Sequence, residues 1–294
     1  MTTENAIEIS NVTIRYGRLT AVDNVTFSVP RGSVSALLGR NGAGKSSLVR
    51  CLLGQRQAQS GTIRVFGQDI WKTREPLMQR VGVVTEEADA PPEMTVDQIM
   101  RFCSELYARW DQSEVDARLK RFEVAGDARF GALSKGQKKQ TLLALALAMS
   151  PDLLVLDDPT LGLDVVARKS LFDEVIAEMA DRGITVFLTT HDLAGIETLA
   201  DRVAIMKNGA LVLEEDLDAL KARFRRIRFT AQPAALEKSA LRTAVLRRWG
   251  SGAEAIVSNY DDIAFEPLRS SNAEVSALSL EEIFIAVAGE GVRS

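Results

Sequence analysis

One stretch of the sequence, residues 39–47, restricts what the chain can fold into more than any other. It follows the pattern G-x-x-x-x-G-K-[S/T], which is the phosphate-binding loop of nucleoside triphosphatases. A short apolar run at residues 33–38 precedes it and predicts a buried strand, and residues 47–53 follow with helical spacing. We therefore expect a nucleotide site here, although a glycine turn that merely joins a strand to a helix has the same local pattern.

The residue types in this loop suit a chain of phosphates. Glycines let successive backbone N–H groups turn toward one anion, and the helix that follows adds the positive end of its dipole. Lys45 is expected to reach the β- and γ-phosphates, and the Ser46 hydroxyl to bind Mg²⁺. The residues expected to hold the nucleotide are Gly39, Arg40, Asn41, Gly42, Ala43, Gly44, Lys45, Ser46 and Ser47.

Composition excludes several classes of protein. The 294 residues are 46% hydrophobic and 26% charged, as in ordinary globular proteins, and the net charge of −4 argues against a nucleic-acid partner. Cys51 and Cys103 lack metal-ligand spacing and fit a reduced, cytoplasmic compartment. We expect no signal peptide and no membrane span, because the most apolar stretch, residues 142–149, is too short.

The chain predicts an α/β fold with a mostly parallel sheet. Apolar runs at residues 81–84, 153–156 and 185–190 read as buried strands separated by helical patterns. Alternating runs at residues 6–14, 25–29 and 62–67 predict a small antiparallel sheet, and residues 15–17 a turn.

Domain boundaries follow from changes in this pattern. We expect an ATP-binding domain at residues 1–218 with a helical subdomain at about 86–150, and a small accessory α/β domain at 219–294. The accessory region begins with a basic, partly alternating run at residues 220–229 and ends with a helix opened by a capping box at residues 279–282.

Three polar residues follow apolar strands of the predicted parallel sheet. Since functional groups cluster at the carboxyl ends of such strands, Asp157, Asp158 and His191 are expected to meet the phosphate loop. Asp157 would hold Mg²⁺ and Asp158 would orient or deprotonate an attacking water. His191, the only histidine, would reach the γ-phosphate. Without the phosphate loop, two helix-capping acids and a structural histidine would be the simpler interpretation.

The ordered set of motifs resembles the nucleotide-binding subunit of an ATP-binding cassette (ABC) transporter, over about residues 5–216. The resemblance implies that Tyr16 stacks on adenine and that Ser134, Gly136 and Gln137 belong to the family signature. The matching segments are Tyr16, the Walker A loop at 39–47, the signature at 133–137, Walker B at 153–158, the D-loop at 161–164 and the switch histidine His191.

The resemblance also implies partners and a location. In that family two cassettes pair head to tail around two ATP molecules and drive a membrane permease, so we expect a second cassette and a separate permease. The chain would lie in the cytoplasm, on the inner face of the membrane. The 219–294 tail is similar to tails of the drug-exporter type of the family, which favours export, and similar subunits of drug and polyketide exporters also carry a glutamate at the position of Glu86.

Three positions depart from the family pattern. Lys135 replaces a signature glycine, Glu86 stands where a metal-sensing glutamine is usual, and Asp158 replaces the usual catalytic glutamate. Glu86 keeps an oxygen ligand for the metal. Asp158 is one methylene shorter, so we expect slow but real hydrolysis.

Two other functions remain open at this point. One is a nucleotide-gated regulatory protein in which ATP drives pairing with negligible hydrolysis. The other is a soluble cassette protein that acts on nucleic acid or ribosomes, although such proteins usually carry two cassettes or long coiled-coil insertions, which this chain lacks.

Overall fold

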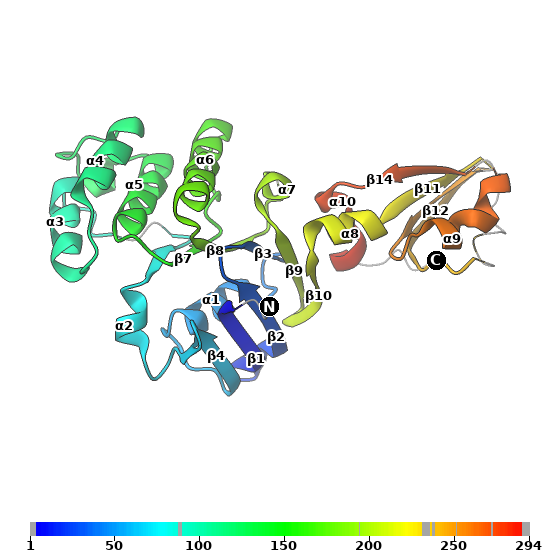
Figure 1. Cartoon of the computed structure of the whole chain (residues 1–294), viewed down its shortest axis with the longest axis horizontal. Helices are drawn as coiled ribbons and strands as arrows, with labels where there is room; N and C mark the ends of the chain where they lie inside the picture. Colours follow the sequence, from blue (N-terminus) through cyan, green and yellow to red (C-terminus); the bar gives the residue numbers. More distant parts are fainter. Residues whose placement is uncertain are drawn as a thin grey trace.

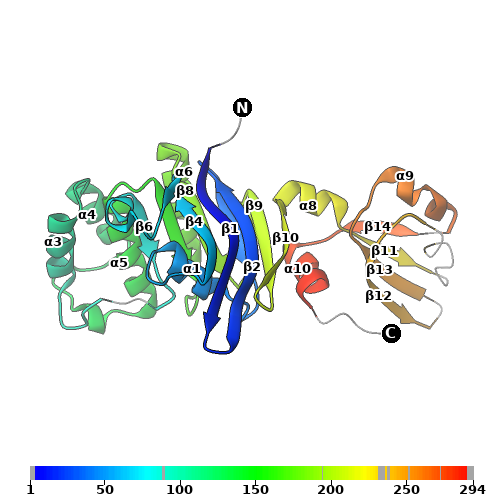
Figure 2. The same ribbon diagram turned by 90° about the horizontal axis from the view of Figure 1, so that it is seen from below.

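The residues that the computed structural model describes form three sheets and a group of helices, arranged in an elongated molecule (Figure 1). The described residues are 4–87, 90–193, 195–230, 236, 239–250, 252–271 and 273–289. The helical part lies at one end and the C-terminal sheet at the other, with two sheets between them (Figures 1 and 2).

The central sheet has six strands in the order β10-β9-β3-β8-β7-β6 and is parallel except for β10. Its strands are β3 (Val34–Leu38), β6 (Val81–Val84), β7 (Leu153–Asp157), β8 (Thr185–Thr190), β9 (Arg202–Lys207) and β10 (Ala210–Asp216). Every residue of β3, β7 and β8 is buried, as expected for parallel strands covered on both faces. The helices that follow these strands are α1 (Lys45–Leu52), α6 (Val165–Arg182) and α7 (Ile196–Leu199). The mostly parallel α/β fold expected from the sequence is therefore confirmed.

A four-stranded antiparallel sheet lies beside it in the order β2-β1-β4-β5. Its strands are β1 (Asn5–Tyr16), β2 (Leu19–Pro30), β4 (Ser60–Val65) and β5 (Gln68–Asp69), and the short helix α2 (Arg74–Met78) follows. The turn expected at residues 15–17 is displaced, because Tyr16 still pairs with Leu19 and the chain reverses at residues 17–18. The strand expected to reach residue 67 ends at Val65, because Phe66 and Gly67 have left-handed backbone angles, with φ of 50° and 77°.

The helical layer comprises α3 (Val96–Leu106), α4 (Gln112–Arg121), the 3₁₀ turn η1 (Phe130–Ala132) and α5 (Lys135–Ala148). Capping boxes formed by Thr95 with Gln98 and by Ser134 with Gln137 start α3 and α5. The buried Arg118 on α4 pairs with Glu178 on α6, which attaches this layer to the central sheet.

The C-terminal part forms an antiparallel sheet in the order β12-β13-β11-β14. Its elements are α8 (Leu217–Arg223), β11 (Arg225–Phe229), β12 (Thr243–Trp249), β13 (Gly252–Val257), α9 (Asp262–Phe265), η3 (Glu266–Ser271), β14 (Glu274–Ala277) and α10 (Leu280–Ala288). The basic run at residues 220–229 is not one strand but the end of α8 followed by β11. The capping box predicted for the final helix is confirmed by Ser279 and Glu282.

Helix α10 turns back from this sheet toward the central one (Figure 2). Leu280 and Ile283 are fully buried in the same apolar cluster as Ile196 and Val203, and Lys207 Nζ donates a hydrogen bond of 2.8 Å to the carbonyl of Gly289. The C-terminal sheet has a separate core of its own, which includes Ile227 and Phe229.

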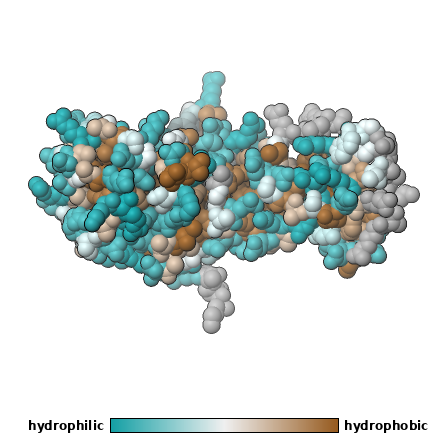
Figure 3. Space-filling model, turned by 90° about the horizontal axis from the view of Figure 1, so that it is seen from above, coloured by the Kyte–Doolittle hydropathy of each residue, from teal (hydrophilic) through white to brown (hydrophobic). Residues whose placement is uncertain are grey.

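Hydrophilic and apolar residues are mixed on the face of the molecule that Figure 3 draws. Figure 3 shows hydrophilic residues over most of one face, with smaller apolar patches between them. Within the described ranges, no helix has both the length and the apolar composition required to cross a bilayer.

Candidate active site

The phosphate loop connects the buried strand β3 to α1. Gly42 and Gly44 have φ of 82° and 105°, which side chains rarely permit. A Cβ atom on Gly44 would lie 2.3 Å from the carbonyl oxygen of Ala21 on β2, so only glycine fits there. The antiparallel sheet therefore fixes the backbone of the loop at the start of α1.

Lys45 is the first residue of α1, and its side chain points back into the phosphate loop. Its side chain is 5% exposed, and Nζ donates a hydrogen bond of 2.8 Å to the carbonyl of Gly39. The carboxylate of Asp158 lies 3.8 Å from the same ammonium. The buried cation is thus held by one carbonyl and one carboxylate, at a position where a phosphate chain can replace both.

Asp157 ends β7 and is buried. It accepts a hydrogen bond from Thr189 Oγ1 on the neighbouring strand β8. The register of the two strands sets this contact, because Asp157 stands opposite Thr189. The parallel pairing thus fixes the orientation of the carboxylate.

Asp158 and His191 form a direct pair. Asp158 Oδ1 lies 2.9 Å from His191 Nδ1 and accepts a second hydrogen bond, of 3.1 Å, from the His191 backbone N–H. Asp158 has a φ of 42°, which is uncommon for a residue other than glycine. Hydrogen bonds from its backbone N–H to the carbonyl and hydroxyl of Thr189, 3.0 and 3.3 Å long, hold it there.

A cavity of about 590 Å³ opens in front of the phosphate loop, a size typical of small-molecule sites. It brings together Tyr16, residues 41–47, Glu86 and Asp158 from the predicted site. Gly39, Arg40, Asp157 and His191 do not line it, although Gly39 and His191 contact Lys45 and Asp158, which do. The other lining residues are Leu19, Thr20, Ala21, Asn208 and Gly209.

The signature segment lies outside this cavity. Ser134 is exposed at the start of α5, where its side chain and that of Gln137 cap the helix, and Gly136 packs toward Ala167 of α6. None of the three lines the cavity at the phosphate loop. The aliphatic part of Lys135 lies over Gly162 of the D-loop segment, where a Cβ would be 3.5 Å from Lys135 Cδ. The substituted signature position therefore contacts the D-loop of its own chain.

Two features of the site escaped the sequence analysis. The Asn208–Gly209 turn was not expected to be part of the site; here the Gly209 N–H donates a hydrogen bond of 3.1 Å to the Ala43 carbonyl. Lys139 was not singled out at all. It is 3% exposed, and Nζ donates to the carbonyls of Thr85 and Glu86 at 2.6 and 2.5 Å. Its position one turn into the largely apolar helix α5 is the sequence feature that could have indicated a buried, functional lysine.

Burial governs the charge of Lys139. Removal from water lowers its pKa, and the nearby carboxylates of Glu86, Asp157 and Asp158 partly oppose this shift. Lys139 is therefore coupled electrostatically to three acids of the predicted site.

The residues present fit a magnesium ion held with a nucleotide. Mg²⁺ in phosphate sites takes one or two carboxylates and completes its shell with phosphates and water. Asp157 with its oriented carboxylate and Ser46 at the phosphate loop supply such donors. Within the described residues, no group of three or more His, Cys, Asp and Glu side chains forms a metal site on its own.

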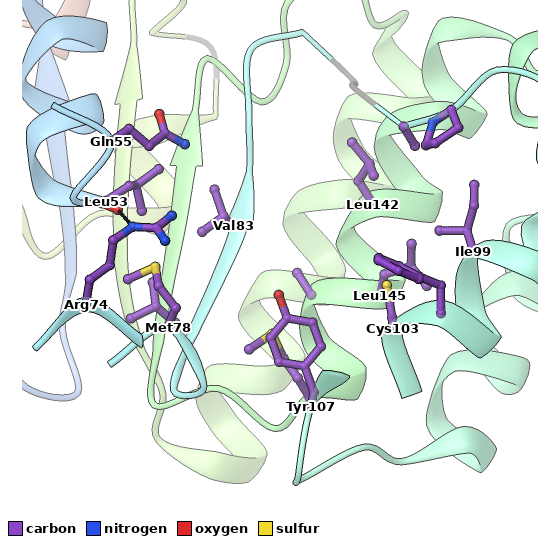
Figure 4. Close-up of a pocket in the computed structure, with 16 residues that line it drawn as sticks. Leu53, Gln55, Arg74, Met78, Val83, Ile99, Cys103, Tyr107, Leu142 and Leu145 are labelled. Carbon is purple, nitrogen blue, oxygen red and sulfur yellow. Dashed lines mark hydrogen bonds between the residues drawn. The ribbon is translucent and has the colours of Figure 1, made fainter. Parts of the chain in front are cut away.

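A second cavity, of about 490 Å³, separates the central sheet from the helical layer (Figure 4). Figure 4 shows Leu53, Met78 and Val83 on one side and Ile99 and Leu145 on the other. Its wall is largely apolar, and Phe102, which also lines it, is 58% exposed. This cavity lies apart from the phosphate loop, and the two share no lining residue.

Comparison with known proteins gives a consistent result. The sequence profile described as "ABC transporter" matches residues 22–161. The bacitracin transport ATP-binding protein BcrA of Bacillus licheniformis is 32% identical over 75% of this chain and 72% of its own length. The Nod factor export ATP-binding protein I of Paraburkholderia xenovorans is 37% identical over 74% of this chain and 73% of its own length. The spermidine/putrescine import ATP-binding protein PotA of Pseudomonas aeruginosa is 38% identical over 76% of this chain and 63% of its own length.

Solved structures agree with the fold. The structure of an ATP-binding subunit of an ABC transporter superimposes with a TM-score of 0.67 and 27% identity, over 74% of this chain and 92% of that one. The cassette fold therefore accounts for about three quarters of the sequence.

Proposed function

The chain belongs to the ABC transporter family as an ATP-binding subunit, and we propose that it hydrolyses ATP to drive export through a separate membrane permease. The observation that supports hydrolysis is that Asp158 contacts both Lys45 and His191 beside the phosphate loop. Each of the three residues is suited to one part of phosphoryl transfer from ATP to water.

The reaction is an in-line displacement. Lys45 leaves the Gly39 carbonyl to bind the β- and γ-phosphates and offsets their charge. Asp158 accepts a proton from the attacking water as its oxygen bonds to the γ-phosphorus, and the bond to the ADP oxygen breaks. His191, held against Asp158 at 2.9 Å, would orient this carboxylate and stabilise charge that develops on the γ-phosphate. Mg²⁺ held by Ser46 and Asp157 would neutralise charge on the phosphates, with Glu86 as a further oxygen ligand.

A pair of cassettes is part of this proposal. Ser134, Gly136 and Gln137 lie outside the chain's own cavity, as residues that serve a nucleotide on another subunit would. Val165 and Val166 at the start of α6 are 77% and 79% exposed, and Leu161 in the D-loop segment is 44% exposed. This apolar surface beside the signature supports contact with a second cassette, either identical or closely related.

The cavity of Figure 4 is the surface we assign to the permease. Its wall is largely apolar, with Gln55 and Arg74 as polar members, and it lies between the helical layer and the sheet, so an inserted permease helix would contact both. The chain would accordingly be cytoplasmic and peripheral on the inner membrane face. We also propose that it divides near residue 218 into the ATP-binding domain and an accessory domain; the outer limits, residues 1 and 294, lie outside the described residues.

A nucleotide-gated protein is the second candidate function, favoured by one observation. The short Asp158 carboxylate contacts both His191 and Lys45, and these contacts would oppose its action on a water at the γ-phosphate. In that case ATP would pair the cassettes and hydrolysis would be negligible.

One experiment separates these functions. Phosphate release from ATP, and pairing of the chain with and without ATP, are measured with the purified full chain and with Lys45→Ala. Each protein is assayed alone and together with any integral membrane protein that co-purifies with it. Turnover that Lys45→Ala abolishes supports the transporter ATPase. ATP-dependent pairing with no phosphate release under either condition would overturn it in favour of the gated protein.

A further inference from the structure

The guanidinium group of Arg56 lies over the ring of Tyr16, with its carbon 4.0 Å from the ring centroid. Arg56 comes from the loop between α1 and β4, whereas Tyr16 is the last residue of β1. Arg56 Nη2 also donates a hydrogen bond of 2.6 Å to the carbonyl of Arg15, the neighbour of Tyr16. The arginine is thus fixed both to the ring and to the backbone that carries it.

The same loop holds the end of β1 at two more points. Gln59 Oε1 accepts a hydrogen bond of 2.6 Å from the Arg15 N–H, and the Gln59 N–H donates one of 2.9 Å to the Thr13 carbonyl. Since Arg15 has both backbone groups bonded to this loop, the position of the Tyr16 ring depends on residues 56–59.

The two faces of the Tyr16 ring have different surroundings. Tyr16 lines the cavity at the phosphate loop, and Arg56 does not. Arg56 instead lines a separate cavity of about 90 Å³ with Cys51 and Trp71, and Tyr16 is absent from its wall. Of this pair, Tyr16 alone borders the nucleotide cavity, whereas Arg56 covers one face of its ring and borders the smaller cavity, so a purine bound in the nucleotide cavity would stack on the other face.

We propose that Arg56 is a positioning residue for the nucleobase of ATP, acting through Tyr16. The guanidinium occupies the electron-rich back face of the ring and polarises it, which favours stacking of an electron-rich purine on the front face. It also holds the ring in the orientation that stacking requires. This inference rests on the proposed ATP site and assigns base recognition to a second layer of residues behind Tyr16.

The test compares two ligands that differ by the nucleoside. Dissociation constants of ATP and of inorganic tripolyphosphate are measured by calorimetry with the full chain and with Arg56→Met, Arg56→Lys and Tyr16→Leu. Arg64→Met, on an exposed position of β4 that lines neither cavity, is the matched control for the lost charge.

We expect Arg56→Met to weaken ATP binding about fivefold, or about 1 kcal/mol, and to leave tripolyphosphate binding unchanged. Arg56→Lys restores part of the loss because it keeps a cation near the ring. In the Tyr16→Leu background, Arg56→Met has no further effect. Unchanged tripolyphosphate binding also shows that each variant is folded.

Three outcomes overturn the inference. They are ATP affinity unchanged in Arg56→Met, equal weakening of ATP and tripolyphosphate, and an effect that persists in Tyr16→Leu. Failure of the unsubstituted chain to bind either ligand is distinct from these, since it would refute the proposed function and this inference with it.

Discussion

Asp158 Oδ1 lies 2.9 Å from Nδ1 of His191, and the other oxygen of the same carboxylate lies 3.8 Å from the Lys45 ammonium. One short acid thus links the sequence's single histidine to the phosphate-loop lysine. Binding of phosphates at Lys45 would remove one of these two contacts, so the charge around Asp158 changes when nucleotide enters.

The length of the Asp158 side chain is the first testable feature. Asp158→Glu should raise turnover several-fold, because the added methylene brings the carboxylate closer to a water on the γ-phosphate. Asp158→Asn should lower turnover about 100-fold, as expected for loss of a general base. Phosphate release measures both. A loss confined to Asp157→Asn, with Asp158→Asn fully active, would contradict the role of Asp158 as base.

Gly44→Ala should abolish ATP binding. The new Cβ would lie 2.3 Å from the Ala21 carbonyl in a residue with φ of 105°, so either the loop or β2 must move. Gly42→Ala is the matched control, since it also has positive φ but would meet no atom within 4 Å. Its cost should be limited to about 1 kcal/mol of backbone strain. Nucleotide titration measures ATP binding by each variant, and thermal unfolding measures its stability. Equal loss of ATP binding in Gly44→Ala and Gly42→Ala would exclude a steric clash as the cause.

Lys139→Met should weaken the link between α5 and the segment after β6. The substitution leaves the Thr85 and Glu86 carbonyls without their donor, and we expect a loss of about 1–3 kcal/mol in the free energy of unfolding. Urea denaturation measures it. Lys138→Met, the adjacent and less buried lysine, should have a smaller effect. Equal stability of the two variants would contradict a stabilising role for the hydrogen bonds from Lys139 to the Thr85 and Glu86 carbonyls.

Arg118→Met should destabilise the chain by about 3–5 kcal/mol, because it leaves Glu174 and Glu178 buried without this partner. Burial already raises the pKa of Glu178, with Arg118 and Arg182 opposing the shift. Arg121→Met also removes a pair with Glu174 but at a side chain 60% exposed, so its effect should stay below about 1 kcal/mol. Chemical denaturation of both variants checks this order.

Asp152 should contribute to acid sensitivity. Partial burial raises its pKa, but hydrogen bonds and charge from Arg80 and Arg109 outweigh this and hold the pKa below its usual value. Because the folded-state pKa is lowered, the stabilisation is present above the unfolded-state pKa and is lost as pH falls through the folded-state value. Asp152→Asn should lower stability at pH 7 by about 0.5 kcal/mol and flatten the acid limb. Unfolding curves at several pH values test this; an unchanged acid limb would contradict it.

The parts of the fold that follow local rules were predictable from sequence. The phosphate loop, the buried strands β7 and β8 and the capping box at Ser279 each carry their signal within a few residues. The turn after β1 was misplaced because the pairing of Tyr16 with Leu19, not the local Gly17, sets where the strand ends.

The contacts around the candidate site were harder to foresee. Asn208–Gly209 reaches the phosphate loop only because β9 lies beside β3, and Lys139 reaches Thr85 only because α5 packs on β6. Such contacts depend on the order of strands in the sheet, and no spacing along the chain encodes them. The roles of the site residues remain predictions that the experiments above address.

Helix α10 has a consequence for how the protein is made. Its buried residues Leu280 and Ile283 pack against apolar side chains of α7 and β9. Along the chain, most of the C-terminal sheet lies between those two elements and α10. During synthesis from the N-terminus, this side of the cassette stays open to water until residues 280–288 leave the ribosome. A nascent chain that already carries every nucleotide-binding motif therefore still exposes an apolar surface that can aggregate. The risk of aggregation is greatest after the phosphate loop is able to fold and before α10 has been made.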